Sequence, residues 1–525
     1  MIRVLSPAMM RAVDAAARDR LGAETPMRVA GRLLAERIRA AAPAGRIVAF
    51  AGPGDNGGDA FAALAELEPD RERIVYALPA RSPSPGRLDA EERARQAGVS
   101  VRPLPADDRS ADAALEGAAL ALDGLLGTGA RLPVGEEMAP AVRALARRWK
   151  IVLAIDSPTG IDGESGAVVE PAVHARETLT LGALKPGLLL DPARTCVGDL
   201  WFGDLGFPTD LFPERTPVGA LDDDAFLRLL PRRPATADKR SAGALVIVAG
   251  SRQFPGAAVL CARAALRAGA GYVTLAAPES TAAVLRTQLV EPVVVELSDH
   301  AHPEHITETI LDLTRRAAAL AIGPGLGLDE RWGVIVREVL RTAPVPCVAD
   351  AGALFHLSKH LASVQGRPLV ITPHAGEFAR LSGEGTIALG DRVRRLRSFV
   401  ERTGIVTLLK GRDTLVFDGE TLHVNLTGCA ALATAGSGDV LTGMIGALLA
   451  QGLSPSDAAR VAAHWHGRAG EVCAHRRPIG TIAGDLPDAL GEALGASVAA
   501  ARNADAPLRL VFRGDHAATL KNGCG

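Results

Sequence analysis

Thr434-Ala435-Gly436-Ser437-Gly438-Asp439 is the most informative stretch of the sequence, and it runs directly into an alanine-rich apolar segment at 439–450. Glycines at these two positions let backbone amides approach an anion, and a following helix adds the positive end of its dipole. Asp439 would face whatever the amides bind, and could accept a proton there. The stretch therefore favours a phosphate-handling turn in an α/β domain, although an ordinary helix capped by Ser437 also fits it.

Three other turns in the same half of the chain follow short apolar runs. The turn at 323–327 is glycine-rich, the turn at 371–378 contains His374, and the turn at 410–414 begins with Lys410. Ligands of open α/β sheets bind at the carboxyl ends of the strands, so we expect these turns to form one site. Each could by itself be a tight turn, and a single histidine is more often structural than functional.

Short apolar runs alternate with helical stretches over most of the chain. The expected strands are 46–51, 74–78, 120–123, 151–155 and 178–181 in the first half, and 245–248, 272–276, 293–297, 320–322, 345–349, 369–372 and 406–410 in the second. Buried strands separated by helices predict parallel sheets covered on both faces. A proline-rich break at 206–224 separates the two halves. We therefore expect two three-layer α/β/α domains at 1–215 and 220–497, with 498–525 as a loosely held tail.

Composition excludes several classes of protein. Hydrophobic residues make up 48% of the chain and charged residues 22%, and the net charge of -2 offers no basic field for nucleic acid or an anionic membrane. The apolar stretches are glycine-broken and shorter than the roughly 20 residues of a membrane span. The six cysteines are scattered, with no C-x-x-C pair. This usage is typical of reduced thiols, so we expect a soluble, cytoplasmic protein with no disulfide framework.

The first half also places polar turns after its expected strands. The turn at 51–59 contains glycines, Asn56, which can offer an oxygen to a cation, and Asp59, which can accept a ribose hydroxyl. The turn at 123–129 adds Asp123, and the turn at 155–162 adds Asp156. The glycine spacing does not match the G-x-G-x-x-G dinucleotide fingerprint, which disfavours a hydride-transferring oxidoreductase. One such turn is ordinary, but three at one sheet edge favour a site.

Residues from about 238 to 471 resemble the carbohydrate-kinase-like domain of NAD(P)H-hydrate dehydratases, in the ribokinase-like superfamily. The matching motifs are T-P-H-A-G-E at 372–377, K-G-R-D-T at 410–414 and G-S-G-D at 436–439. The resemblance implies that Asp439 is the catalytic base for phosphorylation of the hydrated ring, which is followed by loss of phosphate. It implies that the hydrated nicotinamide contacts Asp439, Ala257, Gly325 and His374. It also implies that ADP or ATP, with magnesium, contacts Lys410, Gly411, Arg412, Asp413, Thr414 and Gly438. The sequence departs from the family pattern at Gly352, where aspartate is usual, and at Cys429, where asparagine is usual.

Residues 1 to about 215 resemble the NAD(P)H-hydrate epimerase domain, with L-G-A-L-K-P-G at 181–187 strengthening the match. The resemblance implies that Asp156 is the acid/base and that Asn56, Asp123 and Thr159 bind potassium. It implies that the cofactor contacts Asn56, Gly57, Gly58, Asp59, Gly127, Thr128 and Gly129. Asp55 stands where asparagine is usual, and Arg176 stands where aspartate is common and could reshape the pocket.

The leading hypothesis is a fused two-step repair enzyme that acts on hydrated NADH and NADPH. The alternative is a ribokinase-like small-molecule kinase with a non-catalytic N-terminal binding module. A kinase leaves a stable phosphorylated product, whereas a dehydratase releases phosphate and restores the reduced cofactor. Members of the resembled family commonly form homo-oligomers, so we expect one here. The sequence leaves open whether ADP or ATP is the donor.

Overall fold

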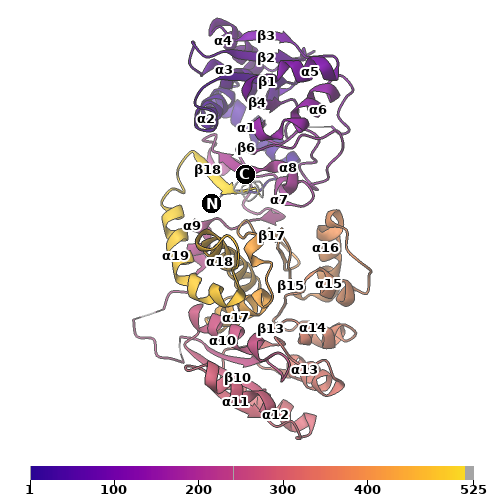
Figure 1. The fold of residues 1–525 in the computed structure, drawn as a ribbon, viewed down its shortest axis with the longest axis vertical. Helices are drawn as coiled ribbons and strands as arrows, with labels where there is room; N and C mark the ends of the chain where they lie inside the picture. Colours follow the sequence, from indigo (N-terminus) through magenta and orange to yellow (C-terminus); the bar gives the residue numbers. More distant parts are fainter. Residues whose placement is uncertain (1, 130, 234, 241, 515–525) are drawn as a thin grey trace. The chain divides into compact units, whose positions relative to one another are not determined.

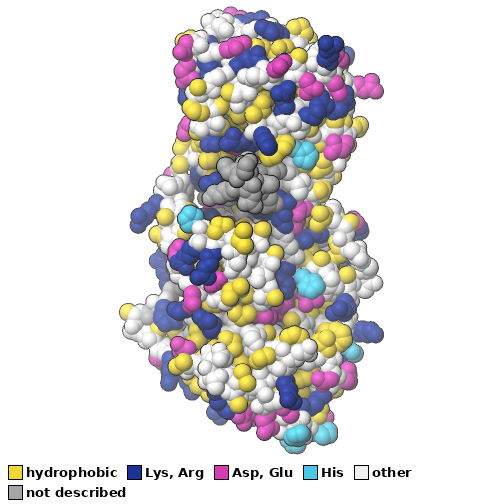
Figure 2. Space-filling model, viewed as in Figure 1, with side chains coloured by type: hydrophobic (Ala, Val, Ile, Leu, Met, Phe, Trp, Pro, Cys, Tyr) yellow, Lys and Arg dark blue, Asp and Glu magenta, His cyan; other side chains and the backbone are white. Residues whose placement is uncertain are grey.

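The computed structural model describes residues 2–129, 131–233, 235–240 and 242–514, and it divides into two compact units (Figure 1). The first domain contains Ile2–Val218 together with the segment from Asn503 onward, and the second contains Gly219–Arg502. Positive and negative side chains are interspersed on the face shown in Figure 2. Among the described residues, no helix is long and apolar enough to cross a membrane.

The first domain is built on an eight-stranded sheet in the order β18-β7-β6-β5-β4-β1-β2-β3, in which β18 runs antiparallel to β7 and the other neighbours are parallel. Its strands are β1 (Arg46–Ala51), β2 (Arg73–Ala77), β3 (Ser100–Pro103), β4 (Ala118–Gly124), β5 (Val152–Ile155), β6 (Glu177–Leu181), β7 (Asp199–Gly203) and β18 (Leu508–Phe512). Its helices are α1 (Pro7–Leu21), α2 (Thr25–Ala41), α3 (Asp55–Ala65), α4 (Pro85–Gln96), α5 (Asp108–Ala114), α6 (Ala139–Arg147), α7 (Pro186–Leu189) and α8 (Arg194–Val197).

Successive side chains of β1 enter two different hydrophobic cores, so both faces of this sheet are buried. Ile47 and Ala49 pack into a core that also contains side chains of α1 to α4. Val48 and Phe50 pack into a second core, with side chains of α5 and α6. Successive side chains of a strand point to opposite faces, so the domain has three layers, as the apolar runs predicted.

The second domain is built on a ten-stranded sheet in the order β11-β10-β9-β12-β13-β14-β15-β16-β17-β8. Its strands are β8 (Val218–Gly219), β9 (Ala244–Val248), β10 (Tyr272–Pro278), β11 (Val293–Leu297), β12 (Ala319–Ile322), β13 (Cys347–Ala349), β14 (Leu369–Ile371), β15 (Val406–Leu409), β16 (Leu415–Phe417) and β17 (Leu422–Val424). Its helices are α9 (Asp223–Leu229), α10 (Pro255–Arg267), α11 (Glu279–Gln288), α12 (Pro303–Thr314), α13 (Glu330–Thr342), α14 (Gly352–Leu357), α15 (Ala375–Ser382), α16 (Arg392–Thr403), α17 (Ser437–Ala450), α18 (Pro455–Arg476) and α19 (Leu486–Ala501).

The same alternation makes the second domain three-layered. Leu245 and Ile247 of β9 join a core with α10, α11, α17, α18 and α19. Val246 and Val248 alternate with them along β9 and are equally buried, so the other face of the sheet is covered as well. The strands from β11 to β15 are parallel, whereas β15, β16 and β17 form an antiparallel meander.

Each sheet has a switch point, where two adjacent strands lead into connections that run in opposite directions. In the first domain β1 and β4 are adjacent, and the amide of Gly52 donates to the Gly124 carbonyl (3.0 Å). A Cβ at Gly52 would lie 1.8 Å from the Leu125 carbonyl oxygen, so glycine is required there. In the second domain β9 and β12 are adjacent, and the amide of Gly250 donates to the Pro324 carbonyl (2.8 Å). Such points form the ligand crevice of open α/β sheets.

The segment after Ser497 differs from the loosely held tail that its lost periodicity indicated. Helix α19 continues to Ala501, and β18 then adds an edge strand to the first sheet. The Asp204 amide donates to the Pro507 carbonyl (2.7 Å), and the Gly514 amide donates to the Asp199 carboxylate (2.7 Å). Residues 515–525 of the expected tail lie outside the described residues. The strand was missed because its partner β7 lies about 300 residues away in sequence, and local patterns carry no such information.

Candidate active sites

A cavity of about 430 Å³ opens at the switch point of the first sheet. The predicted site residues that line it are Asn56, Asp59, Gly127, Thr128, Gly129 and Asp156. Gly57 and Gly58 lie beneath it in the first turn of α3. A Cβ at Gly57 would lie 2.2 Å from the Gly52 carbonyl oxygen, and one at Gly58 would lie 2.6 Å from Cε of Met27. These two glycines therefore allow α3 to begin close under the cavity, and they do not line it.

Asp156 directly follows β5 and carries a backbone φ of 64°, which is uncommon for a residue other than glycine. Its Oδ2 accepts from the Thr128 amide (3.1 Å) and from the Thr128 hydroxyl. Its Oδ1 accepts from the Leu181 amide (3.2 Å) and from the ammonium group of Lys185, which is 1% exposed. Burial alone would raise the pKa of Asp156, but Lys185 and these hydrogen bonds lower it below its usual value. Asp156 is therefore an ionised base.

Two further carboxyl groups face the same cavity, and their pKa values move the other way. Burial raises the pKa of Asp14 to about 6, partly offset by Lys185 and assisted by the negative charge of Asp156. Burial and the same neighbouring charge raise the pKa of Asp59 well above its usual value. The cavity thus holds the ionised Asp156 beside Asp14 and Asp59, which bind protons more readily, and this is the separation that acid–base chemistry requires.

Asp123, Thr159 and Asn56 meet beside this cavity. The fully buried Asp123 carboxylate accepts from the Thr159 hydroxyl (2.8 Å) and amide (2.7 Å), and burial raises its pKa to about 6. The Asn56 amide contacts the same turn, because a Cβ at Gly127 would lie 2.9 Å from Asn56 Oδ1. Asn56 Nδ2 is buried without a hydrogen-bond partner among the described residues.

The Asp123 carboxylate, the Thr159 hydroxyl and the Asn56 side-chain oxygen are oxygen donors of the kind that a hard cation binds. The described part of the chain has no group of three or more His, Cys, Asp or Glu side chains that could hold a metal ion.

Of the two departures from the epimerase pattern, one is paired with neighbouring side chains and the other lies away from the cavity. The Asp55 carboxylate accepts from Arg18 (2.8 Å) and from the Ser84 hydroxyl (2.5 Å), so its extra negative charge is paired. Arg176 precedes β6, at the end of the strand away from the cavity, and lies 3.7 Å from the Glu177 carboxylate. Arg176 does not line the cavity, so the expectation that it reshapes the pocket was wrong.

In the second domain, the Asp350 carboxylate joins two of the predicted turns. Its Oδ1 accepts from Lys410 Nζ (2.9 Å), and its Oδ2 accepts from the Thr442 hydroxyl in α17 (2.8 Å). A Cβ at Gly438 would lie 3.2 Å from Lys410 Nζ, so the lysine sits beside the start of α17. Burial lowers the pKa of Lys410, but Asp350 and Glu377 raise it more, and the side chain is cationic. A cation beside free helix-terminal amides is suited to phosphate groups.

Asp439 lies in the first turn of α17, after Gly436 with a φ of 91°. Burial and the negative charge of Asp350 raise the pKa of Asp439 to about 7, with Lys410 partly offsetting both. A carboxylate that titrates near neutrality can take up and return a proton under ordinary conditions. The sequence identified this aspartate and the lysine, and the structure brings them into one group.

The 410–414 turn is shaped from below by Arg392. A Cβ at Gly411 would lie 2.2 Å from Arg392 Nη1, and the same guanidinium lies 3.3 Å from the Asp413 carboxylate, which is 1% exposed. The Thr414 hydroxyl donates to the Gly411 carbonyl (2.7 Å) and closes the turn. Asp413 therefore points away from the solvent side, whereas Gly411 and Arg412 are exposed.

The remaining predicted contacts divide into two places. Ala257 and Gly325 adjoin, because a Cβ at Gly325 (φ 66°) would lie 2.8 Å from Ala257 Cβ. His374 caps α15: its Nδ1 accepts from the Gly376 amide (3.0 Å), while the Glu377 carboxylate accepts from the His374 amide (2.8 Å). His374 therefore has a structural role as a helix cap. Its side chain is also 62% exposed and can contact a ligand.

Several functional side chains escaped the sequence analysis. Lys185 lay within a quoted motif, and Asp350 stood visibly at a strand exit, but neither was assigned a role. Arg392 lies 18 residues before the turn that it supports, and Glu377 was noted only as part of its motif. A strand-exit aspartate followed by glycine is the one local signal that indicates Asp350. The others depend on tertiary contacts.

Comparisons with known proteins cover both domains. A family described as YjeF-related protein N-terminus matches residues 23–187, and one described as NAD(P)H-hydrate dehydratase matches residues 245–492. A Bacillus subtilis structure of an ADP/ATP-dependent NAD(P)H-hydrate dehydratase, co-crystallised with ATP and Mg²⁺, is 29% identical. It covers 54% of this chain and 100% of its own, with a TM-score of 0.47.

Full-length relatives span nearly the whole chain. A bifunctional NAD(P)H-hydrate repair enzyme of Salinibacter ruber is 36% identical over 520 residues, covering 92% of this chain and 95% of the relative. The protein of the same name from Methanothermobacter thermautotrophicus is 34% identical over 505 residues, covering 91% and 94%. On this identity and coverage, the chain belongs to the family of bifunctional NAD(P)H-hydrate repair enzymes.

Proposed function

We propose that the second domain phosphorylates the ring hydroxyl of hydrated NADH or NADPH with ADP or ATP and then expels phosphate, while the first domain interconverts the R and S forms. One observation carries the proposal. Asp439, whose pKa burial and Asp350 raise to about 7, lies in the first turn of α17 after Gly438, and a Cβ at Gly438 would lie 3.2 Å from the Lys410 ammonium group. Base, anion-binding amides and cation are the three elements that phosphoryl transfer to a hydroxyl requires.

In the dehydration step, Lys410 and the amides of Gly438 and Gly411 bind the phosphates of the nucleotide. Asp439 takes the proton of the ring hydroxyl while the hydroxyl oxygen attacks the terminal phosphorus of the nucleotide. The bond from that phosphorus to the bridging oxygen of the nucleotide breaks. The lone pair of the ring nitrogen then expels the phosphate. Loss of a proton from the adjacent ring carbon restores the double bond. The ligand lies against the adjoining Ala257 and Gly325, with His374 at its edge.

Magnesium is expected to be held by the nucleotide rather than by a protein cage. Among the described residues no group of carboxylates is arranged to hold a metal ion alone, and Asp350 already bonds Lys410 and Thr442. Magnesium commonly binds through substrate phosphates, where it neutralises their charge. Lys410 and the amides of Gly411 and Gly438 would then contact the nucleotide directly.

In the epimerisation step, Asp156 is the ionised base and Lys185 keeps it so. Asp14 and Asp59 hold protons more readily and can return one to the substrate. Asn56, Asp123 and Thr159 would hold potassium, which would supply a fixed positive charge near the bound phosphates. Proton shuttling at the hydrated carbon, or reversible ring opening, then interconverts the two forms.

The test follows absorbance of the reduced cofactor after the protein is mixed with hydrated NADH, magnesium, potassium and either ADP or ATP. Asp439→Ala should abolish recovery. Asp457→Asn is the matched control, because Asp457 also occupies the first turn of a helix, bonded to Ser454 and Arg460. Recovery with one nucleotide names the donor.

Recovery of only the S fraction would show a dehydratase with an inactive first domain. Recovery of the whole mixture, reduced to the S fraction by Asp156→Asn, would establish both steps. A stable phosphorylated product without phosphate release would instead establish the alternative of a small-molecule kinase. No recovery with either nucleotide, from a folded protein that binds them, would refute the proposal.

A further inference from the structure

The loop at 425–436, which leads from β17 into α17, lies along one face of α18. A Cβ at Gly467 would lie 2.1 Å from the Thr427 hydroxyl, and one at Gly470 would lie 2.6 Å from Cγ of Leu432. These glycines, one turn apart on α18, let the loop approach the helix closely. The Thr427 hydroxyl also donates to the His464 carbonyl (2.8 Å).

Few apolar contacts hold the part of this loop that leads to α17. Each residue from 428 to 436 is half-buried or exposed, and in that segment only the half-buried Leu432 packs against the hydrophobic core, so polar contacts supply most of its other anchors. Its backbone also carries two residues of positive φ, Gly428 (115°) and Gly436 (91°). A segment with little apolar burial takes its position from specific hydrogen bonds, and it is the kind of segment that opens locally when they are lost.

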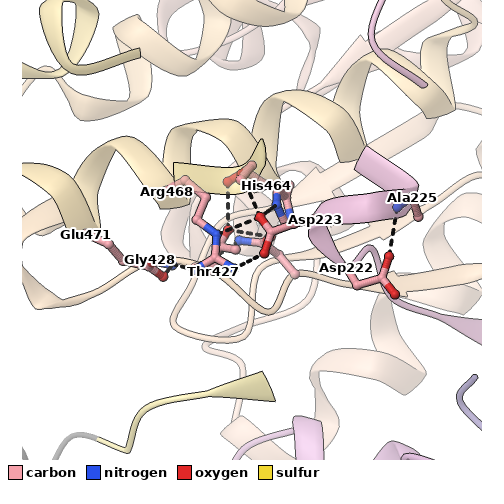
Figure 3. Close-up of polar contacts among 10 residues, drawn as sticks. Asp222, Asp223, Ala225, Thr427, Gly428, His464, Arg468 and Glu471 are labelled. Atoms are coloured by element: carbon pink, nitrogen blue, oxygen red, sulfur yellow. Dashed lines mark hydrogen bonds and ion pairs between the residues drawn. The ribbon is translucent and has the colours of Figure 1, made fainter. Parts of the chain in front are cut away.

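Glu471 of α18 supplies the central bond. Its Oε1 accepts from the Gly428 amide (2.8 Å), and its Oε2 accepts from Arg468 Nη1 (2.7 Å), as Figure 3 shows. Both oxygens are therefore committed, and the carboxylate has one orientation. A hydrogen bond between a backbone amide and a carboxylate is charge-assisted and stronger than a neutral one.

Asp223, in the first turn of α9, fixes Arg468 in turn. Arg468 Nε donates to Asp223 Oδ1 (3.0 Å) and its Nη2 donates to Oδ2, while His464 Nε2 also donates to Oδ1 (3.1 Å; Figure 3). The Ser497 hydroxyl donates to the same oxygen (2.6 Å). Burial raises the pKa of Asp223, but His464 and Arg468 lower it below its usual value. The buried, ionised Asp223 carboxylate of α9 thus orients the Arg468 guanidinium of α18. His464 of α18 and Ser497 of α19 hold that carboxylate in place.

The same helix holds the far end of the loop. Nε2 of His466 lies 3.1 Å from the Ser437 carbonyl oxygen and 3.3 Å from the Ser437 hydroxyl. Burial lowers the pKa of His466 to about 4, so the ring is neutral and its Nε2–H donates to the carbonyl. α18 therefore contacts the loop at Thr427 and Gly428 and again at Ser437, directly before Gly438 and Asp439.

We propose that Asp223, Arg468 and Glu471 are positioning residues for the dehydration reaction, which rests on the function proposed above. Asp223 orients Arg468, Arg468 orients Glu471, and Glu471 fixes the Gly428 amide. The course of the loop from Gly428 to Gly436 then determines where the Gly438 amide and Asp439 contact the phosphoryl group. None of the three residues touches substrate in this scheme.

The test uses the full chain with Glu471→Ala and Glu471→Gln. The alanine variant leaves the Gly428 amide without its partner, and the glutamine variant retains an amide oxygen that can accept from it. Glu492→Ala is the matched control, since it breaks the ion pair between Arg476 of α18 and Glu492 of α19 and touches no loop residue. Melting temperature is measured for each variant, together with kcat and KM for hydrated NADH and for the nucleotide.

Glu471→Ala should lower kcat/KM for the nucleotide by about ten- to hundredfold, the value expected for loss of one charge-assisted hydrogen bond. Glu471→Gln should recover most of that loss. Asp223→Asn should give a loss of the same kind, because Arg468 keeps a hydrogen-bond acceptor at position 223 but loses the charge of Asp223 that orients its guanidinium from the side away from Glu471. Glu492→Ala should leave both kinetic constants near those of the unmodified enzyme.

Hydrogen exchange across 427–439 gives a readout independent of turnover. It should rise in Glu471→Ala and remain near normal in Glu471→Gln and Glu492→Ala. Unchanged exchange in Glu471→Ala, or equal kinetic losses in Glu471→Ala and Glu492→Ala, would overturn the inference. An unmodified enzyme that fails to dehydrate would refute the proposed function instead, and the exchange result would still decide whether Glu471 holds the loop.

Discussion

Asp350→Asn should move the pH dependence of dehydration toward lower pH. Asp439 has a pKa of about 7 instead of its usual 3.8, because it is buried and because Asp350 adds a negative charge. A base acts only when ionised, so the rate should rise through about pH 7 and then level off. At pH 5, two units below, about 1% of Asp439 is ionised, and the rate should be about a hundredfold below its plateau.

The substitution acts on Asp439 through two routes with the same sign. It removes the negative charge of Asp350, and it frees Lys410 from its 2.9 Å ion pair, so that the ammonium group can stabilise ionised Asp439 instead. A like charge nearby commonly shifts a carboxyl by one unit or more, so we expect the midpoint to fall by about one unit. One unit corresponds to about 1.36 kcal/mol. The amide oxygen of asparagine can still accept from one of the two donors, and its NH2 group can donate to the Thr442 hydroxyl oxygen, which limits structural damage.

The assay measures kcat for dehydration between pH 5 and 9 with both substrates saturating. Asp418→Asn is the control, because Asp418 is half-buried in the same domain but bonds Ser456 and Thr421 instead. Its midpoint should match that of the unmodified enzyme. A profile that is flat from pH 5 to 9, or a midpoint that stays in place or rises in Asp350→Asn, would refute the assignment of Asp439 as the titrating base.

Four further perturbations test other parts of the structure. Gly467→Ala forces a Cβ against the Thr427 hydroxyl and should lower dehydration at least tenfold, without reducing epimerisation; equal loss of both steps would contradict this. Thr159→Val removes a hydroxyl from the expected cation group, so epimerisation should lose its response to added potassium; a retained response would exclude Thr159 as a ligand. Ending the chain at Arg502 removes β18 and should lower the melting temperature of the first domain by roughly 4–8 °C, for a loss of about 2 kcal/mol, whereas ending it at Gly514 should not. Asp439→Asn should raise the melting temperature more at pH 8 than at pH 5, because the folded state favours protonated Asp439 and loses that stability as pH rises from about 4 to about 7; an equal rise at both would contradict the raised pKa.

The sequence predicted the parts of the fold that local patterns determine. Apolar runs such as 46–51 and 245–248 became central parallel strands, because strands buried on both faces are apolar throughout. Most of the strands that it missed lie at sheet edges or in the meander, and the exception is β7 (Asp199–Gly203), which lies between β6 and β18. β3 (Ser100–Pro103) is mostly exposed and therefore has no apolar run, and β16 and β17 have only three residues each. Pairing of β18 with β7 is a long-range contact that no local pattern carries.

The candidate sites divide in the same way. Glycine-rich turns at strand ends indicate where backbone amides are free, so Gly438, Asp439 and Lys410 were identified from short motifs. A short motif does not identify the distant side chain that shifts the pKa of a site residue. Asp350 and Lys410 are 60 residues apart, and Asp156 and Lys185 are 29 apart, so their contacts depend on the completed sheet.

The two domains show how the same residue types acquire opposite properties. In the first domain a buried lysine, Lys185, bonds the proposed catalytic aspartate itself, so the pKa of Asp156 falls and the group is ionised. In the second domain Lys410 bonds Asp350 instead, and Asp439 faces a carboxylate whose charge the lysine offsets only in part, so its pKa rises to about 7. Which carboxylate the lysine contacts therefore decides whether the aspartate is a permanent anion or a base that titrates near neutrality. Asp156 is already ionised when the substrate arrives, whereas Asp439 is ionised in only part of the molecules at neutral pH. On this reasoning, dehydration should show the midpoint of Asp439 at about pH 7, and epimerisation measured on the same sample should instead follow the groups of its own cavity, among them Asp14 with a pKa of about 6.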